Sequence, residues 1–305
     1  MGEVEAEPDG GRWELLRALG SIAVDNPPAS NPVCDALGLP RWERYEHTNL
    51  FVLDLPPYAS VYLGVEGGLG GTVTEAAAGI WKAMGMVPPG EPDHVGALLG
   101  LYAHLGDSAA RCATSATAAR LGHAMRVILW EHLWTWCPSY LRAFATGSPD
   151  GSPAQAWATL LGAALEREAA SSKPPSLLPS VLSDAPEPIS ADPSLDELLD
   201  TLIATVRSGF IVTFTDLSSA ASRVGVGLRR GERRFALRSM LEQDPGGTLS
   251  WMAGHARRWE ARHAAASFDP NGNPGPGRLI SDWWARRAAH TATVLETVAG
   301  SRCEH

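Results

Sequence analysis

Apolar residues along most of the chain recur every three or four positions, which is the spacing of one face of an α-helix. The clearest stripe follows Glu91-Pro92-Asp93-His94 and consists of Val95, Leu98, Leu99, Tyr102 and Leu105. Pro92 suits a first helical position, and Asp93 suits the positive end of the helix dipole. The pattern therefore predicts a helix whose first turn holds an acid and an imidazole. Taken alone, this spacing favours a dipole-stabilising acid beside a surface histidine.

A second stripe runs through an aromatic segment and consists of Leu121, Met125, Ile128, Leu129, His132, Leu133 and Trp136. His132 and Trp136 are four residues apart, so they face the same way. Pro138 then interrupts the stripe, because proline cannot continue the hydrogen-bond ladder of a helix. Spacing alone favours an aromatic core stripe here.

Helical spacing also predicts helices over 12–24, 72–86, 106–120, 153–170, 194–207, 215–224, 231–243, 247–265 and 279–299. Only 50–56 and 210–214 are strand-like, and both segments are short and isolated. The sequence therefore predicts an all-α fold.

One proline-rich stretch divides the chain. Residues 171–193 contain six prolines, too many for a helix, and are typical of an exposed linker. We therefore expect a helical domain over 1–170, a Pro-rich linker over 171–193 and a helical extension over 194–305.

Composition excludes several classes of protein. No apolar run approaches the roughly 20 residues of a membrane-spanning helix. The acidic N-terminus lacks the basic and apolar regions of a secretory signal. Four cysteines, Cys34, Cys112, Cys137 and Cys303, form no CxxC pair, which argues against a zinc knot or a disulfide scaffold. We expect a cytoplasmic protein without a membrane span.

The net charge of −9 is distributed unevenly. Residues 1–100 carry 14 acidic and 5 basic residues, whereas residues 201–305 carry 9 acidic and 14 basic residues. An acidic first third suits a cationic partner.

Recognisable catalytic machinery is absent from the sequence. No GxGxxG motif follows a strand, and GxxxxGK[ST], HExxH and GxSxG do not occur. The glycine-rich piece 64–71 lacks the lysine of a phosphate loop, and the nine histidines are dispersed. We therefore expect no enzyme, no cofactor and no metal site.

Three segments in order carry a family resemblance. They are Pro56-Pro57-Tyr58-Ala59-Ser60-Val61-Tyr62-Leu63-Gly64, then Glu91-Pro92-Asp93-His94, then Glu131-His132-x-x-x-Trp136. Over roughly residues 10–170 the chain resembles the TorD/DmsD/NarJ family, whose marks are an acidic-Pro-Asp-His motif and a downstream His-x-x-Pro-Trp motif. Members are all-helical chaperones dedicated to molybdoenzymes of the dimethyl-sulfoxide-reductase type. Thr135 stands where the family usually has the proline.

The resemblance implies a TorD-like helical bundle, here with an additional C-terminal helical extension. It also implies a chaperone that binds the twin-arginine leader of a molybdoenzyme catalytic subunit during molybdopterin insertion, before export. Carboxylates can receive the guanidinium groups, and an aromatic-edged groove can receive the apolar helix of the leader. The expected binding residues are Glu91, Asp93, His94, Leu98, Tyr102, Glu131, His132, Trp134 and Trp136.

Other interpretations concern mainly the last third. Residues 215–226, followed by Arg229, Arg230, Arg233, Arg234 and Arg238, echo a DNA-binding helix-turn-helix, although two packed helices with a solvated arginine face explain the same pattern. We expect no nucleic-acid partner. A guanine-nucleotide-dependent enzyme is a further alternative. The extension, with Trp251, Trp259, Trp283 and Trp284 among arginines, is also a candidate surface for docking the partner enzyme.

Overall fold

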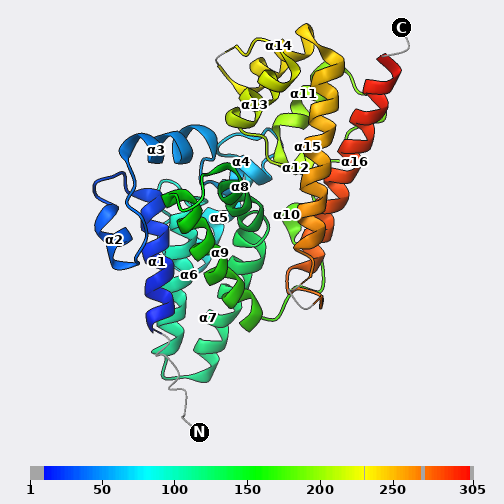
Figure 1. Cartoon of the computed structure of the whole chain (residues 1–305). Helices are drawn as coiled ribbons and strands as arrows, with labels where there is room; N and C mark the ends of the chain where they lie inside the picture. The colour runs from blue at the N-terminus through cyan, green and yellow to red at the C-terminus, as the bar shows by residue number, and fades with distance from the viewer. Residues whose placement is uncertain (1–9, 230, 269–271, 303–305) are drawn as a thin grey trace. The chain divides into compact units, whose positions relative to one another are not determined.

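The computed structural model describes residues 10–229, 231–268 and 272–302 (Figure 1). The acidic N-terminus up to Asp9, Arg230 and Cys303 lie outside this range. The described residues fold into helices and form no β-sheet, which confirms the all-α prediction. None of the described helices is both long enough and apolar enough to cross a membrane. The chain divides into two compact units: unit 1 comprises 1–53, 57–59 and 74–173, and unit 2 comprises 54–56, 60–73 and 174–305.

Unit 1 is a helical bundle in which α1 packs against α6 and α9, and α6 packs against α7 (Figure 1). The helices of the first 173 residues are α1 (Gly10–Val24), α2 (Asn31–Ala36), α3 (Arg44–Thr48), the π-helix η1 (Asn49–Asp54), α4 (Ala59–Leu63), α5 (Thr72–Ala83), α6 (Val95–Ala110), α7 (Ser115–Val127), the π-helix η2 (Ile128–Leu133), α8 (Cys137–Gly147) and α9 (Pro153–Ser171). The prediction of one helix over 106–120 is wrong, because α6 ends at Ala110 and α7 begins at Ser115. Thr114 breaks it, because its side chain accepts from the Thr117 N–H and so starts α7 as a new helix.

Aromatic rings form the core of unit 1 around Trp157. The ring of Phe51 lies 5.1 Å from that of Trp157 and 5.2 Å from that of Phe144, between ring centroids. The Trp157 indole N–H donates to the Leu19 carbonyl at 2.9 Å. Phe51 belongs to the strand-like segment 50–56, which is mostly the π-helix η1. The strand expectation there is wrong: a strand would bury Phe51, Leu53 and Leu55 on one face, but Val52 and Leu53 are both exposed.

Unit 2 is organised by two long helices that lie side by side, α15 and α16 (Figure 1). Shorter helices α13 and α14 pack against α15, and α11 packs against α14. The helices after residue 173 are α10 (Ser180–Ser183), α11 (Leu195–Ile203), α12 (Thr205–Ser208), α13 (Phe214–Val224), α14 (Arg233–Gln243), α15 (Pro245–Ala265) and α16 (Arg278–Arg302). Trp259 and Trp284 are each 2% exposed, so these two tryptophans are core residues and offer no docking surface.

The second strand-like segment, 210–214, is buried but pairs with no strand. Side chains bind its backbone carbonyls instead. The Gly209 carbonyl, just before the segment, accepts from the His263 imidazole at 3.0 Å. The Ile211 carbonyl accepts from the His255 imidazole at 2.8 Å. The Val212 carbonyl accepts from Arg233 at 2.8 Å. Side-chain donors thus satisfy the buried backbone that a sheet would otherwise satisfy.

Unit 2 also contains residues from the first quarter of the chain. The Asp54 carboxylate accepts from the backbone N–H groups of Phe214 and Thr215, and Arg207 donates to the Val65 carbonyl at 2.7 Å. The proline-rich segment after residue 173 belongs to the same unit.

The proline-rich segment is not exposed throughout. Its Leu182 and Ile189 are buried, and Arg287 donates to the Pro186 carbonyl at 2.6 Å. The segment also contains the short helix α10, so it combines buried side chains with one helical turn.

Contacts of the arginines argue against a helix-turn-helix. Helix α14 begins at Arg233, eight residues after Gly225, whereas the motif needs a turn of about 3–4 residues. Arg234 pairs with both Asp196 and Asp200, and Arg238 also pairs with Asp196. These guanidinium groups hold α14 to α11, so they are not displayed for phosphate binding.

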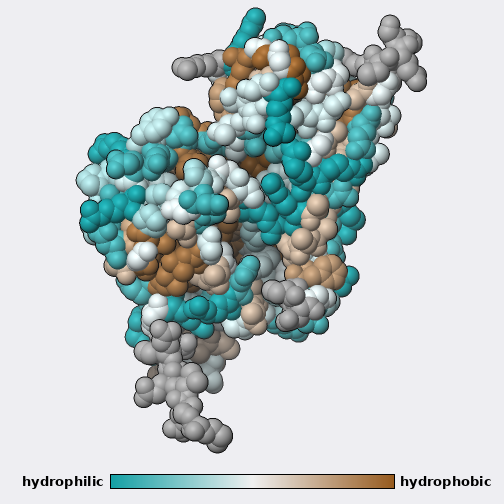
Figure 2. Space-filling view, viewed as in Figure 1, coloured by the Kyte–Doolittle hydropathy of each residue, from teal (hydrophilic) through white to brown (hydrophobic). Residues whose placement is uncertain are grey.

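The face of the molecule shown in Figure 2 is mostly polar and carries scattered apolar patches. Within unit 1 the largest exposed apolar side chains include Val24, Tyr45, Val52 and Val87. Val52 is followed by the exposed Leu53, whereas Val24, Tyr45 and Val87 have no exposed large apolar neighbour in sequence. Single exposed apolar residues are normal on protein surfaces.

Candidate functional site

The first two segments of the family resemblance meet through their backbones. The Val95 N–H donates to the Pro57 carbonyl at 2.8 Å, and the Ala59 N–H donates to the Asp93 carbonyl at 3.1 Å. Between these bonds Tyr58 and His94 form an isolated antiparallel bridge. Their rings meet edge to face, with centroids 4.9 Å apart. The structure thus joins two motifs that lie more than thirty positions apart in the sequence into one small site within unit 1.

His94 is the N-cap of α6. Its backbone is extended, and its Nδ1 accepts from the Gly96 N–H at 3.0 Å. Helix α6 therefore begins at Val95, and the prediction that Asp93 and His94 share its first turn is wrong. The physical reason is that a side-chain acceptor at the cap satisfies an N–H that the first turn leaves unpaired. Burial lowers the pKa of His94, although the negative charges of Glu91 and Asp93 act to raise it. The lowered pKa keeps the imidazole neutral, so that Nδ1 can accept the hydrogen bond.

Glu91 is the exposed carboxylate of this site, and it is hydrogen-bonded to the Tyr58 hydroxyl. Burial, this hydrogen bond and the charges of Glu91 and Asp93 together raise the pKa of Tyr58 to about 12. Tyr58 therefore stays a hydrogen-bond donor at neutral pH and orients Glu91. Tyr58 is a site residue that the sequence did not single out, although it lies within the first segment of the resemblance.

The α6 residues among the predicted site residues face the core instead. Leu98 is fully buried, and Tyr102 is 4% exposed. The Tyr102 hydroxyl donates to the buried Glu168 carboxylate at 2.8 Å, and the Arg12 guanidinium lies 3.8 Å from the same carboxylate. Burial and the charge of Glu168 raise the pKa of Tyr102. The Tyr102 hydroxyl and the Glu168 carboxylate therefore have partners inside the bundle, and their contacts link α6 to α9 and α1.

The second motif lies at the junction of η2 and α8. The Trp136 indole N–H donates to the His132 carbonyl at 2.7 Å, and the Thr135 hydroxyl donates to the Glu131 carbonyl at 3.1 Å. Pro138 occupies the first turn of α8, where its missing N–H costs nothing. Thr135, which replaces the usual proline of the family, thus supplies a side-chain bond that helps to hold the turn.

His132 is half-buried in this turn. Burial lowers its pKa to about 4, so its imidazole is neutral at physiological pH. It can therefore donate or accept a hydrogen bond there, but it does not repel an arginine.

The nine predicted residues differ in accessibility. Glu91 is exposed, Glu131 and His132 are half-buried, and Asp93, His94, Leu98, Tyr102, Trp134 and Trp136 are buried. Helices α6 and η2 pack against each other. The first motif ends at the N-cap of α6, and the second motif begins within η2. A peptide can reach Leu98, Tyr102, Trp134 and Trp136 only where the bundle opens, because their side chains are 0–8% exposed.

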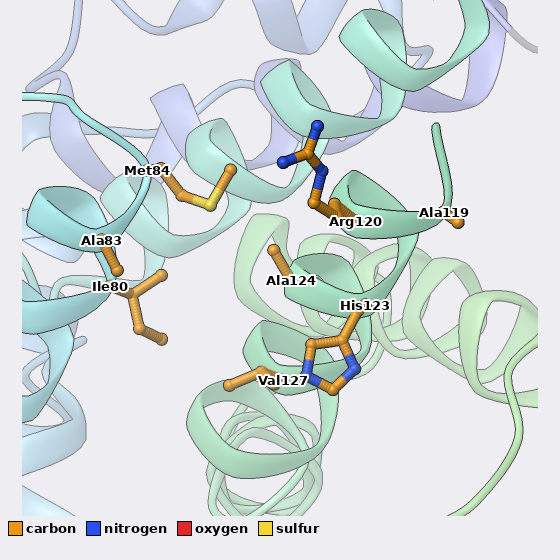
Figure 3. A pocket seen from close by; sticks show the side chains of 8 residues that line it. All are labelled: Ile80, Ala83, Met84, Ala119, Arg120, His123, Ala124 and Val127. Atoms are coloured by element: carbon orange, nitrogen blue, oxygen red, sulfur yellow. The ribbon is translucent and has the colours of Figure 1, made fainter. Parts of the chain in front are cut away.

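An open apolar groove lies elsewhere in unit 1, between the end of α5 and α7 (Figure 3). Its volume is about 490 Å³. It is lined by Ile80, Ala83, Met84, Ala119, Arg120, His123, Ala124 and Val127. None of the nine predicted residues lines it.

Within 10–229, 231–268 and 272–302, no three or more His, Cys, Asp and Glu side chains come together in a group that could hold a metal ion. Glu91, Glu131 and the imidazoles of His94 and His132 can offer hydrogen bonds, and the two carboxylates can also form ion pairs.

Comparison with known proteins supports the resemblance. Residues 39–142 match the family model described as nitrate reductase delta subunit. The match contains all three segments described above, including both motifs. No curated protein matches the chain.

Proposed function

Because residues 39–142 belong to the nitrate reductase delta subunit family of TorD/NarJ-type molybdoenzyme maturation chaperones, we propose that this protein binds the twin-arginine leader of a molybdoenzyme catalytic subunit. In this proposal the chaperone works in the cytoplasm. It keeps the apoenzyme from export until the molybdopterin cofactor has been inserted.

The observation that carries the proposal is the oriented, exposed carboxylate of Glu91. Tyr58 fixes Glu91 from one side, and the backbone bridge between Tyr58 and His94 fixes Tyr58. A carboxylate held in this way loses little side-chain entropy when it receives a guanidinium group. Glu131, half-buried on η2, is the second candidate acceptor.

Charge in the first third of the chain favours the same partner. Residues 1–100 carry nine more acidic than basic residues, so a basic leader approaches an attractive field. Such attraction raises the association rate and weakens as salt is added. We therefore expect leader binding to be salt-sensitive.

The test uses the full-length protein and synthetic peptides of the twin-arginine leaders encoded in its source genome. Binding is measured by isothermal titration with wild type, Glu91→Gln and, as a matched control, Glu46→Gln, which removes an exposed carboxylate of α3. Glutamine preserves the shape and a hydrogen bond to Tyr58 but removes the charge. We expect Glu91→Gln to weaken binding about 5–30-fold, the difference between a charge-assisted and a neutral hydrogen bond. We expect Glu46→Gln to change little.

The role of His94 needs a variant that keeps the helix cap. His94→Asn retains a good N-cap, whereas His94→Ala removes it and costs about 1 kcal/mol of stability. If the imidazole contributes to the peptide site, both variants weaken leader binding. Both also lose the ring contact with Tyr58, but alanine lowers the melting temperature further because it removes the cap as well. Unchanged leader binding in both Glu91→Gln and His94→Asn would contradict the assignment of these residues to the leader site. It would not affect the family match of residues 39–142.

A further inference from the structure

The groove between α5 and α7 is unusual because both of its walls are incompletely packed (Figure 3). In α5 only Val73 and Ala77 are buried, and α7 has no buried residue along its thirteen positions. Protein interiors are normally packed as densely as organic crystals. An apolar hollow of about 490 Å³ between two such helices therefore marks a surface that another molecule can fill.

Small side chains produce the hollow. Ala83 on α5 and Ala119 and Ala124 on α7 leave space that larger residues would fill, while Ile80 and Val127 make its walls apolar. In Figure 3 the α5 and α7 side chains stand on opposite sides of this space. The groove thus has the form of a helix-binding groove, in which side chains of a partner helix enter between two host helices.

Two arginines lie at the groove. Arg120 lines it, and the Arg126 guanidinium donates to Nδ1 of the lining residue His123 at 3.1 Å. Lys82 neighbours the lining residue Ala83 in sequence. From Ala76 to the end of α5, and throughout α7, the sequence contains no acidic residue. This local positive charge contrasts with the acidic first third of the chain.

We propose that the α5–α7 groove binds an amphipathic helix of a partner protein, with aliphatic side chains facing inward and carboxylates along its edges. The α7 lining residues run from Ala119 to Val127, which is roughly 12 Å at 1.5 Å per residue. That length matches about two turns of a partner helix and anchors at i, i+3 or i+4, and i+7. Carboxylates at the edges would meet Arg120 and Arg126.

This groove is distinct from the leader site proposed above. A twin-arginine peptide would bring its guanidinium groups against Arg120 and Arg126, and like charges at an interface cost binding energy. The inference therefore stands or falls independently of leader binding. A chaperone with both sites would contact two chemically different segments.

The experiment uses the full-length protein and two synthetic helical peptides of about four turns, long enough to be partly helical. Both carry leucine at i, i+3, i+4 and i+7. One carries glutamates at the flanking positions and the other carries lysines there. Fluorescence anisotropy at low and moderate salt measures their affinities for wild type, Ala124→Trp, Arg120→Glu and the control Ala116→Trp. Ala116 is an exposed α7 residue outside the groove lining.

We expect the glutamate peptide to bind wild type at least tenfold more tightly than the lysine peptide, a difference of about 1.4 kcal/mol. Ala124→Trp fills the groove and should abolish this binding, whereas Ala116→Trp should not. Arg120→Glu should reduce the preference for the glutamate peptide, because it replaces one of the cations at the groove by an anion. Leader binding should be unchanged in Ala124→Trp, which separates this result from that of the leader experiment.

Three outcomes would overturn the proposal. Equal affinity for both peptides would show that charge does not select the partner. Undiminished binding in Ala124→Trp would place the peptide elsewhere. Sedimentation that shows a dimer of wild type and a monomer of Ala124→Trp would assign the groove to a second copy of this chain.

Discussion

Asp54 connects the family-matched part of the sequence to a helix more than 150 positions further on, and its removal tests how unit 2 is held together. Its Oδ1 accepts from the Phe214 N–H at 2.8 Å and from the Thr215 N–H at 3.3 Å, and its Oδ2 accepts from the Thr215 hydroxyl. Thr213 caps the next N–H of the same helix, that of Asp216, at 2.9 Å. The first turn of α13 is therefore satisfied jointly by a local cap and by Asp54.

Asp54→Ala leaves two helix-terminal N–H groups without a protein acceptor and removes a negative charge from the positive end of α13. Loss of a side-chain cap costs about 1 kcal/mol, and loss of the dipole interaction costs about 0.3–1 kcal/mol. Asp54 is half-buried, so water partly replaces the lost bonds. We expect the free energy of unfolding of unit 2 to fall by about 2 kcal/mol. That corresponds to a melting temperature lower by roughly 4–8 °C.

Thermal and urea unfolding measure the loss, and hydrogen exchange locates it. Asp54→Asn keeps a neutral acceptor and should cost about half as much. Glu66→Ala removes an exposed carboxylate from the same stretch of chain and should change stability by less than about 0.5 kcal/mol. Faster exchange is expected at the Phe214 and Thr215 amides in Asp54→Ala alone. The reasoning is refuted if Asp54→Ala unfolds like Glu66→Ala, or if the exchange of those two amides does not change.

Two further predictions concern backbone space and titration. Gly209 and Gly225 have similar positive φ values, +82° and +80°, but a Cβ at Gly209 would lie 2.3 Å from the Ala288 nitrogen whereas a Cβ at Gly225 meets nothing. Circular dichroism melts should therefore show a loss of about 1 kcal/mol for Gly225→Ala and about 4 kcal/mol for Gly209→Ala, and equal losses would contradict the packing argument. The pKa of His132 is about 4 in the folded state, against about 6.5 for an unperturbed histidine, so unfolding takes up a proton below about pH 6.5. Its stabilising contribution is fully present above that pH and is lost as the pH falls toward 4. The free energy of unfolding, measured with urea, should therefore fall between pH 7 and pH 4.5 by roughly 2 kcal/mol less in His132→Gln than in wild type.

Hydrophobic spacing predicted the helices well where a long stripe faces one core. The stripe from Val95 to Leu105 is the buried face of α6, and the predicted helices over 153–170 and 247–265 correspond to α9 and α15. Spacing could not place the start of α6, because Pro92 and Asp93 are equally typical of a first turn. Only the bond from the Gly96 N–H to His94 decides the boundary.

The solvent accessibility of the site residues could not be predicted from the sequence. Trp136 and Leu98 have the residue types of a binding groove, but the same types form cores. The structure assigns both to the interior of unit 1, where they are 1% and 0% exposed. Motif spacing identified the segments that meet. It could not show that Tyr58 orients Glu91, because that contact depends on the bridge between two separate loops.

The division into units changes how the role of the C-terminal third must be tested. The family match over 39–142 includes 60–73, and this stretch lies in unit 2 with the C-terminal helices. Within it Val61, Tyr62 and Leu63 are buried, and the Val65 carbonyl accepts from Arg207. Truncation after the proline-rich segment would therefore expose apolar residues of the family-matched region as well as remove the extension. Loss of partner capture in a truncated protein would consequently not distinguish a docking role from a folding role. Point substitutions on the surface of α15 and α16 in the full-length chain avoid this ambiguity, because they leave the partners of 60–73 in place.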